Sequence, residues 1–280
     1  MLKKKKIKRY FSFQFILYIF GRFKLIRKLY KFINLRLTTV SNINCTYSNP
    51  LKKIDNEKKI INNLESKGYH EGLFLNKKTT NRFLELCNKA KIITTLDDKN
   101  FNSFDEVNNF NKNNDKPYTL LNLFSHDLQD FAYNVARDME LIKIVKNYLG
   151  KVNQIDTKVQ WSPLCNADDN WRENNGQTVT YHYDVHHLNF LYIFFYLTDC
   201  DRNTGAHELI IGSHLKKNIF KHLIGSAKKN ENGLVEYYGK DNFKIIEGNS
   251  GYGFVEDTSC YHRARIPTKN DRIAVQFRYY

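Results

Sequence analysis

The 280-residue chain is 41% hydrophobic and 14% aromatic, a composition that excludes a disordered protein and fits one large domain or at most two small ones. Its net charge of +15 would suit a nucleic-acid partner, but the charge is unevenly distributed. Residues 1–54 contain 14 of the 44 Lys and Arg residues and no Asp or Glu, which leaves 30 basic residues against 29 acidic ones in the rest. We therefore predict a basic N-terminal tail on a nearly neutral body, with no specific nucleic-acid partner.

The cysteines and the first apolar run indicate the compartment. Five cysteines, an odd number without CxxC spacing, are typical of reduced thiols in a cytoplasmic protein. The apolar run at residues 10–20 is only about eleven residues long, too short to span a bilayer. No small-residue cleavage site follows it, so the sequence predicts neither a secretion signal nor a transmembrane helix.

The basic tail alternates charged and large apolar side chains. Residues 1–36 include twelve Lys and Arg residues among Phe, Leu, Ile and Tyr, and the spacing partly fits a 3.6-residue period. This pattern predicts a basic amphipathic helix in residues 1–37, with Gly21 as a candidate break, followed by a linker at 38–54. Such a helix suits an anionic membrane surface, so we expect a cytoplasmic protein peripheral to the inner face of the membrane.

The first part of the body is mainly helical. Periodicity predicts a helix at 56–67 that ends at Gly68, a strand at 69–75 and a helix at 79–91. The stretch 97–117 is rich in Asn, Asp and Lys and reads as a loop or insertion. A long helix is expected at 127–149, terminated by Gly150.

From residue 152 onward, short apolar segments alternate with Gly and Asn turns. The predicted strands are 152–161, 178–184, 188–197, 207–211, 243–247, 252–256 and 272–280. A polar loop at 162–177 separates the first two. This pattern favours a mainly β fold, a jelly roll with flanking helices. The predicted organisation is a tail and linker at 1–54 and a body at 55–280, with the jelly-roll core at about 152–280.

One strand carries a candidate metal motif. Residues two apart project from the same face of a strand, so His182 and Asp184 would point at a common site. His262 is the best candidate for a third ligand, which would complete the two-histidine, one-carboxylate facial triad of non-haem iron(II). Taken alone, the HxD pattern is weak, because most strand histidines are simply hydrogen bonded.

The last predicted strand adds a candidate anion-binding residue. Arg272 and Arg278 fall on the same face of this strand, together with Ala274 and Gln276. A guanidinium group in a buried strand is costly unless it meets an anion, and its planar shape suits a carboxylate. The two arginines lie roughly 20 Å apart along the strand, so both cannot bind one small co-substrate. We favour Arg272 and keep Arg278 as the alternative.

Together these motifs resemble the phytanoyl-CoA dioxygenase family. The resemblance spans residues 60–280, and its ordered motifs are 182–184 (HYD), 194–199 (FFYLTD), 203–207 (NTGAH), 211–214 (IGSH), 256–258 (EDT), His262 and Arg272. It implies a double-stranded β-helix, iron(II) bound by His182, Asp184 and His262, and 2-oxoglutarate bound by Arg272.

The family's chemistry defines the expected function. The resemblance implies that O2 and 2-oxoglutarate are consumed, that succinate and CO2 are released, and that an aliphatic carbon is hydroxylated. The expected substrate is a small molecule, a lipid or a glycan precursor. Asp184 disfavours halogenating relatives, in which a small residue replaces the carboxylate. Ile211 stands where the family usually has Pro, and the His262–Arg272 interval is about one residue short.

Two other classes remain open. A cupin-like isomerase could share the barrel, although no second histidine falls within the first motif. A catalytically silent protein could use the barrel for binding and dock on a membrane or nucleic acid through its tail. The intact triad and Arg272 favour the enzyme, a dioxygenase dependent on Fe(II) and 2-oxoglutarate.

Overall fold

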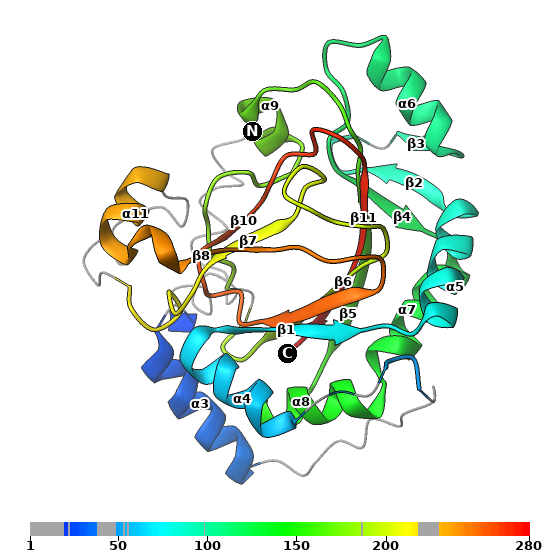
Figure 1. The fold of residues 1–280 in the computed structure, drawn as a ribbon. Helices are drawn as coiled ribbons and strands as arrows, with labels where there is room; N and C mark the ends of the chain where they lie inside the picture. The colour runs from blue at the N-terminus through cyan, green and yellow to red at the C-terminus, as the bar shows by residue number, and fades with distance from the viewer. Residues whose placement is uncertain are drawn as a thin grey trace, which may run out of the picture.

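The computed structural model describes residues 20–21, 23–37, 49–52, 54, 56–97, 99–185, 187–217 and 230–280. Within them, two antiparallel sheets face one another, and helices cover the outer side of the larger sheet (Figure 1). This is the predicted jelly roll with flanking helices, so the expected fold class is confirmed.

The larger sheet has eight strands in the order β1-β9-β6-β11-β5-β4-β2-β3. In chain order their bounds are β1 Tyr69–Phe74, β2 Lys91–Thr94, β3 Asn100–Phe101, β4 Leu121–Phe124, β5 Ile155–Ser162, β6 Leu191–Tyr196, β9 Tyr252–Glu256 and β11 Arg272–Tyr279. The smaller sheet has the order β10-β7-β8, with bounds β7 His207–Ile210, β8 Phe243–Ile246 and β10 His262–Ala264. Four strands of the larger sheet thus precede residue 152.

Helices pack on the outer face of the larger sheet. They are α4 Glu57–Lys67, α5 Lys77–Asn88, α7 His126–Ala136 and α8 Met139–Leu149 (Figure 1). The periphery carries the other helices, which are α3 Lys24–Leu37, α6 Phe104–Lys112, α9 Asp169–Asn174 and α11 Glu231–Tyr238 (Figure 1). A 3-10 turn follows α11 at Lys240–Asn242. The helix at 56–67 ends as predicted at Gly68, whose φ of 85° is left-handed and suits glycine.

Strand β11 shows how the sequence builds this arrangement. Its side chains alternate between buried and half-buried over all eight residues. Ile273, Val275 and Phe277 join the large apolar core that the helices cover. Arg272 and Arg278 therefore lie on the opposite face, toward the smaller sheet. The interior between the two sheets is consequently lined by polar side chains as well as aromatic ones.

The prediction of a loop at 97–117 is wrong. This stretch forms β3 and α6, and the Ser103 hydroxyl caps the helix by accepting from the Glu106 N–H. Val107 is buried, and the Phe104 ring packs edge-on against Trp161 with 4.6 Å between centroids. A few apolar anchors thus suffice to order a segment whose polar majority faces solvent.

The predicted long helix at 127–149 is also wrong, because it is two helices. The break falls at Arg137 and Asp138, between α7 and α8. The Asp138 carboxylate accepts hydrogen bonds from the N–H groups of Glu140 (2.9 Å) and Leu141 (3.3 Å). Asp138 therefore marks the start of a second helix. The apolar periodicity continues across this residue, so periodicity alone predicted one helix.

Two further predictions are corrected. Residues 178–184 do not form a regular strand; they make isolated bridges at Tyr181 and His182, and His182 pairs with His262. Strand β10 was not predicted.

The predicted helix of the tail corresponds in part to α3, which lies beside α4 (Figure 1). Residues 1–19 and most of the predicted linker fall outside the described residues. In the part of the chain that the structure describes, no helix combines the length and apolarity needed to cross a bilayer.

Replacing Asp138 with Ala should lower the free energy of unfolding by about 1 kcal/mol, because two helix N–H groups lose their acceptor. Urea denaturation measures this change. Glu140→Ala is the matched control, since this side chain is exposed in the same turn and caps nothing. Equal midpoints for the two variants would show that Asp138 is not a functional helix cap.

Candidate metal centre

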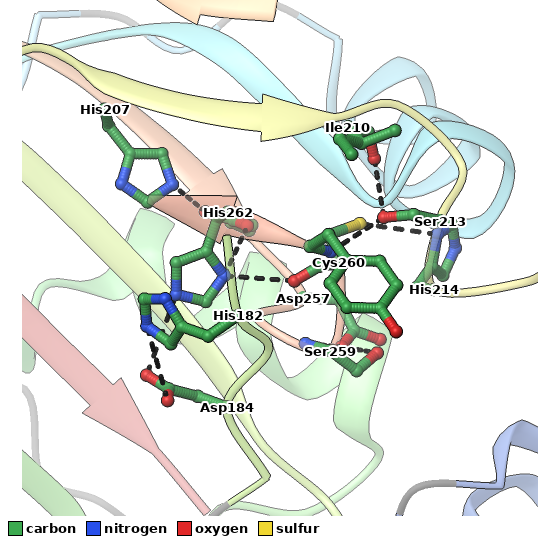
Figure 2. Close-up of polar contacts among 12 residues, drawn as sticks. His182, Asp184, His207, Ile210, Ser213, His214, Asp257, Ser259, Cys260 and His262 are labelled. Carbon is green, nitrogen blue, oxygen red and sulfur yellow. Dashed lines mark hydrogen bonds and ion pairs between the residues drawn. The ribbon is translucent and has the colours of Figure 1, made fainter. Parts of the chain in front are cut away.

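Three predicted ligands come together between the two sheets. The ligand atoms of His182, Asp184 and His262 all lie within 4.8 Å of one another. The Nε2 atoms of His182 and His262 are each 3.8 Å from an oxygen of the Asp184 carboxylate. Figure 2 shows both imidazoles and the carboxylate turned toward one point. The arrangement can hold a metal ion on one face and leave its other positions open.

The hydrogen bonds of both imidazoles favour metal binding through Nε2. His182 Nδ1 lies 3.0 Å from the Thr180 carbonyl oxygen, and His262 Nδ1 lies 3.0 Å from the Cys260 carbonyl oxygen. A carbonyl oxygen can only accept, so each Nδ1 carries the proton and donates it. The Nε2 lone pairs are therefore free for a metal, as in other metal-binding histidines.

The electrostatics of the site favour a cation. Burial lowers the pKa of His182 to about 4, so its ring is neutral and ready to coordinate. Burial also acts to lower the pKa of His262, but Glu256 and Asp184 outweigh it and raise that pKa to about 9. The two carboxylates thus stabilise positive charge at His262, and a metal ion can supply that charge in place of a proton.

Backbone hydrogen bonds fix the relative positions of the ligands. His182 N donates to the His262 carbonyl at 3.0 Å, and His262 N donates to the His182 carbonyl at 2.7 Å. Asp184 N donates to the Thr258 carbonyl at 2.8 Å. The segment that carries two ligands is therefore paired directly with the segment that carries the third.

A carboxylate outside the triad holds the start of this segment. Glu173, in α9, accepts hydrogen bonds from the N–H groups of Val179 (2.9 Å) and Thr180 (2.8 Å). These contacts replace the strand pairing that was expected at 178–184. No sequence motif identifies Glu173, because its partners are backbone groups.

A residue from the N-terminal helix anchors the other segment. Arg27 of α3 is 9% exposed, and its guanidinium binds both oxygens of Asp257 at 3.0 and 2.9 Å. It also donates to the Ser259 hydroxyl at 2.9 Å, and Tyr148 donates to the same carboxylate at 2.8 Å. We call this cluster of Arg27, Asp257, Ser259 and Tyr148 the Arg27 clamp.

The Arg27 clamp lies one residue from a backbone contact of the metal site. Burial alone would raise the pKa of Asp257, but Arg27 holds it well below its usual range. The carboxylate is therefore ionised, and its neighbour Thr258 presents the carbonyl that accepts from Asp184. Arg27 is one of the twelve basic residues expected to meet an anionic membrane surface, and its burial excludes that role. No local sequence pattern predicts the burial of Arg27, because its partner Asp257 lies 230 residues further along the chain.

Arg272 lies at the edge of the same interior. Its guanidinium donates to the Gly205 carbonyl and, at 3.1 Å, to the Ser162 hydroxyl, while its buried Nε has no hydrogen-bond partner. Two more buried polar side chains, His207 of β7 and Glu256 of β9, lie near the triad. Each lies close to His262.

These two side chains form a polar link next to the triad. His207 Nε2 lies 2.6 Å from Glu256 Oε2, and Glu256 Oε1 lies 3.5 Å from His262 Nδ1. The His207 ring is stacked on that of His262, with 5.2 Å between centroids. His207 Nε2 and both Glu256 oxygens also lack well-aligned hydrogen bonds. The interior beside the triad thus offers polar atoms to a polar ligand.

Arg278 occupies a different place on the same strand face. Its Nε donates to the Gln276 side chain at 2.6 Å, and its guanidinium carbon lies 5.1 Å from the Tyr192 ring centre. In the sheet register Arg278 pairs with Tyr192 and Asp156, whereas Arg272 pairs with Ser162. The two arginines therefore mark separate regions of the interior.

No model of a known protein family matches the sequence, and no curated protein does either. Solved structures do match the fold. The non-haem α-ketoglutarate-dependent epimerase SnoN from nogalamycin biosynthesis aligns with a TM-score of 0.54 and 12% identity, over 80% of this chain and 82% of that one. HygX from Streptomyces hygroscopicus, with nickel, 2-oxoglutarate and hygromycin B bound, aligns with a TM-score of 0.52 and 10% identity, over 79% and 86%.

The class that the fold defines is therefore the jelly roll shared with non-haem, 2-oxoglutarate-dependent enzymes. At these identities the likeness concerns the fold. Membership of the phytanoyl-CoA dioxygenase family stays a prediction.

Arg27→Ala should destabilise the protein by about 3–5 kcal/mol, because it leaves a buried carboxylate without its partner. It should also weaken cobalt(II) binding by about tenfold, since outer contacts position the ligands. Urea denaturation and cobalt(II) absorption titration measure the two effects.

Lys28→Ala is the matched control, since Lys28 is the next residue of α3 and is exposed. Cobalt affinities that agree between the two variants would show that the Arg27 clamp stabilises the fold without positioning the ligands.

Proposed function

We propose that this protein is a non-haem iron(II) oxygenase that uses 2-oxoglutarate as its co-substrate. The observation that carries the proposal is the convergence of His182, Asp184 and His262, with both Nε2 atoms free, inside a jelly roll. Bound iron(II) would supply the oxidising chemistry, in which O2 and 2-oxoglutarate are converted to succinate and CO2 as the substrate is oxidised.

The protein's own residues have distinct roles in this proposal. His182, Asp184 and His262 hold the metal. The Arg27 clamp and Glu173 fix the backbone segments that carry these ligands. The apolar core holds one face of β11, so the polar side chains of that strand are directed to the opposite face.

Arg272 is proposed to bind the distal carboxylate of 2-oxoglutarate. Three features support it over Arg278. Its Nε is buried and has no hydrogen-bond partner, which a carboxylate could satisfy. The Ser162 hydroxyl beside it offers a second donor. The polar residues His207 and Glu256 lie close to His262, and Arg272 donates to the Gly205 carbonyl, two residues before His207. In HygX and SnoN, metal and 2-oxoglutarate have been seen bound within the same fold.

The expected reaction is hydroxylation of an aliphatic carbon in a small molecule, a lipid or a glycan precursor. Asp184 supports hydroxylation over halogenation, because the carboxylate occupies the position that halide would need. The fold alone does not fix the outcome, since SnoN is an epimerase. The motifs shared with the phytanoyl-CoA dioxygenase family are the basis for this preference. The cupin-like isomerase and the silent binding protein have no comparable support from the interior.

The first test is metal binding under anaerobic conditions. The wild-type protein should bind about one iron(II) per chain and develop a charge-transfer band when 2-oxoglutarate is added. His182→Ala and His262→Ala should lose both signals, because two protein ligands are too few to retain the ion. His126→Ala is the control, since that histidine is exposed and outside the triad. A His182 or His262 variant with wild-type iron affinity would contradict the assignment.

The second test separates the two arginines. Arg272→Ala should weaken 2-oxoglutarate binding by about 2–5 kcal/mol, at least about thirtyfold, because one carboxylate loses its partner in a desolvated site. Iron affinity should stay unchanged. Titration of the charge-transfer band with 2-oxoglutarate measures the effect, and Arg278→Ala is the matched variant. A large loss in Arg278→Ala together with a silent Arg272→Ala would transfer the role to Arg278.

A further inference from the structure

Helix α3 exposes its apolar side and turns its cationic side inward. Leu25, Leu29, Phe32 and Ile33 have exposed fractions of 81%, 59%, 52% and 44%. Their spacing of four, three and one residues places them in one stripe along the helix. We call these four residues the α3 stripe. A surface helix of a water-soluble domain normally shows the opposite arrangement, and an exposed apolar patch marks an interaction site.

Contacts with the body fix this orientation. Arg27 is buried in the Arg27 clamp, with a bidentate bond to Asp257. Lys24 donates to the Glu65 carbonyl at 3.3 Å, and Lys31 donates to the Tyr148 carbonyl. If the helix rolled to bury its stripe, the buried Asp257 carboxylate would lose its guanidinium partner, which is costly. The stripe is therefore held toward solvent by the contacts on the other side of the helix.

The charge of the N-terminal sequence selects the partner of the stripe. Lys28 is exposed on the same helix, and the sequence of residues 1–36 contains twelve basic residues and no acidic one. A second copy of this chain would bring the same positive charge against itself. Nucleic acid would neutralise the charge but leave the stripe in water. An anionic bilayer surface both neutralises the positive charge and buries the apolar stripe. Basic side chains meet the headgroups, and apolar side chains enter the headgroup boundary.

We propose that the α3 stripe docks the protein on a bilayer surface that contains anionic lipids. The helix lies along the surface and does not cross it, and its inward side stays bound to the barrel. Docking in this orientation would place the loop of the Arg27 clamp directly behind the membrane-bound helix. The proposal does not depend on the metal or on 2-oxoglutarate, so it can fail while the proposed function stands.

The experiment is co-sedimentation of the full chain with vesicles of phosphatidylcholine, with and without about 30% phosphatidylglycerol. The triple variant Leu25→Gln, Leu29→Gln, Phe32→Gln removes most of the stripe and keeps every charge. The matched control is Leu96→Gln, Phe124→Gln, Met139→Gln, three other exposed apolar residues on the body. Thermal unfolding establishes that both variants are folded.

The wild type and the control should bind the anionic vesicles, and the stripe variant should bind them roughly tenfold less. Part of the wild-type binding should persist in about 0.5 M NaCl, because salt screens the charges but not the apolar contact. Equal binding by the stripe variant, or complete loss of wild-type binding in salt, would overturn the proposal. Concentration-dependent self-association that the stripe variant abolishes, without vesicle binding, would instead assign the stripe to a second copy.

Discussion

Pairing of two distant backbone segments underlies the whole site. The reciprocal hydrogen bonds between His182 and His262, with the bond from Asp184 N to the Thr258 carbonyl, join segments that are eighty residues apart in the chain. The segment of His182 forms isolated bridges only, and the segment of His262 forms the three-residue strand β10. The ligand geometry therefore depends on this short bridge and on the contacts behind it, from Glu173 on one side and the Arg27 clamp on the other.

The Arg27 clamp makes the N-terminal helix part of the body. A buried ion pair loses hydration on both partners, so it adds little net stability compared with apolar residues of the same shape. The ion pair instead specifies one arrangement, because any other position of α3 leaves Asp257 without its guanidinium partner. Five donor groups converge on the Asp257 carboxylate: two from Arg27 of α3, the Tyr148 hydroxyl, and the N–H and hydroxyl of Ser259 in the loop itself. The clamp orients the helix and the metal-site loop at the same time.

The interior between the sheets is polar for a related reason. The outer face of the larger sheet is closed by helices and filled with apolar side chains, so β11 must place its remaining side chains inward. Arg272 and Arg278 then lie in separate regions of an interior that also holds His207 and Glu256. Several of their polar atoms lack hydrogen bonds within the described residues. Unsatisfied buried groups are costly, and a bound polar ligand could satisfy them.

The sequence by itself determined the features that follow from local periodicity. The alternation in β11, the end of α4 at Gly68, most of the strands after residue 152 and the jelly-roll class were all predictable, because each depends on neighbouring residues. His182 and Asp184 could be paired because they are two residues apart.

Only the tertiary structure decided the rest. The start of 178–184 is not a strand because Glu173 takes the N–H groups of Val179 and Thr180. Helix α6 forms because Phe104 reaches Trp161. The direction in which α3 faces was open, since an amphipathic pattern says which residues share a side but not which side is buried. Arg27 is inside because Asp257 is there to receive it, and a contact across 230 residues leaves no local signal.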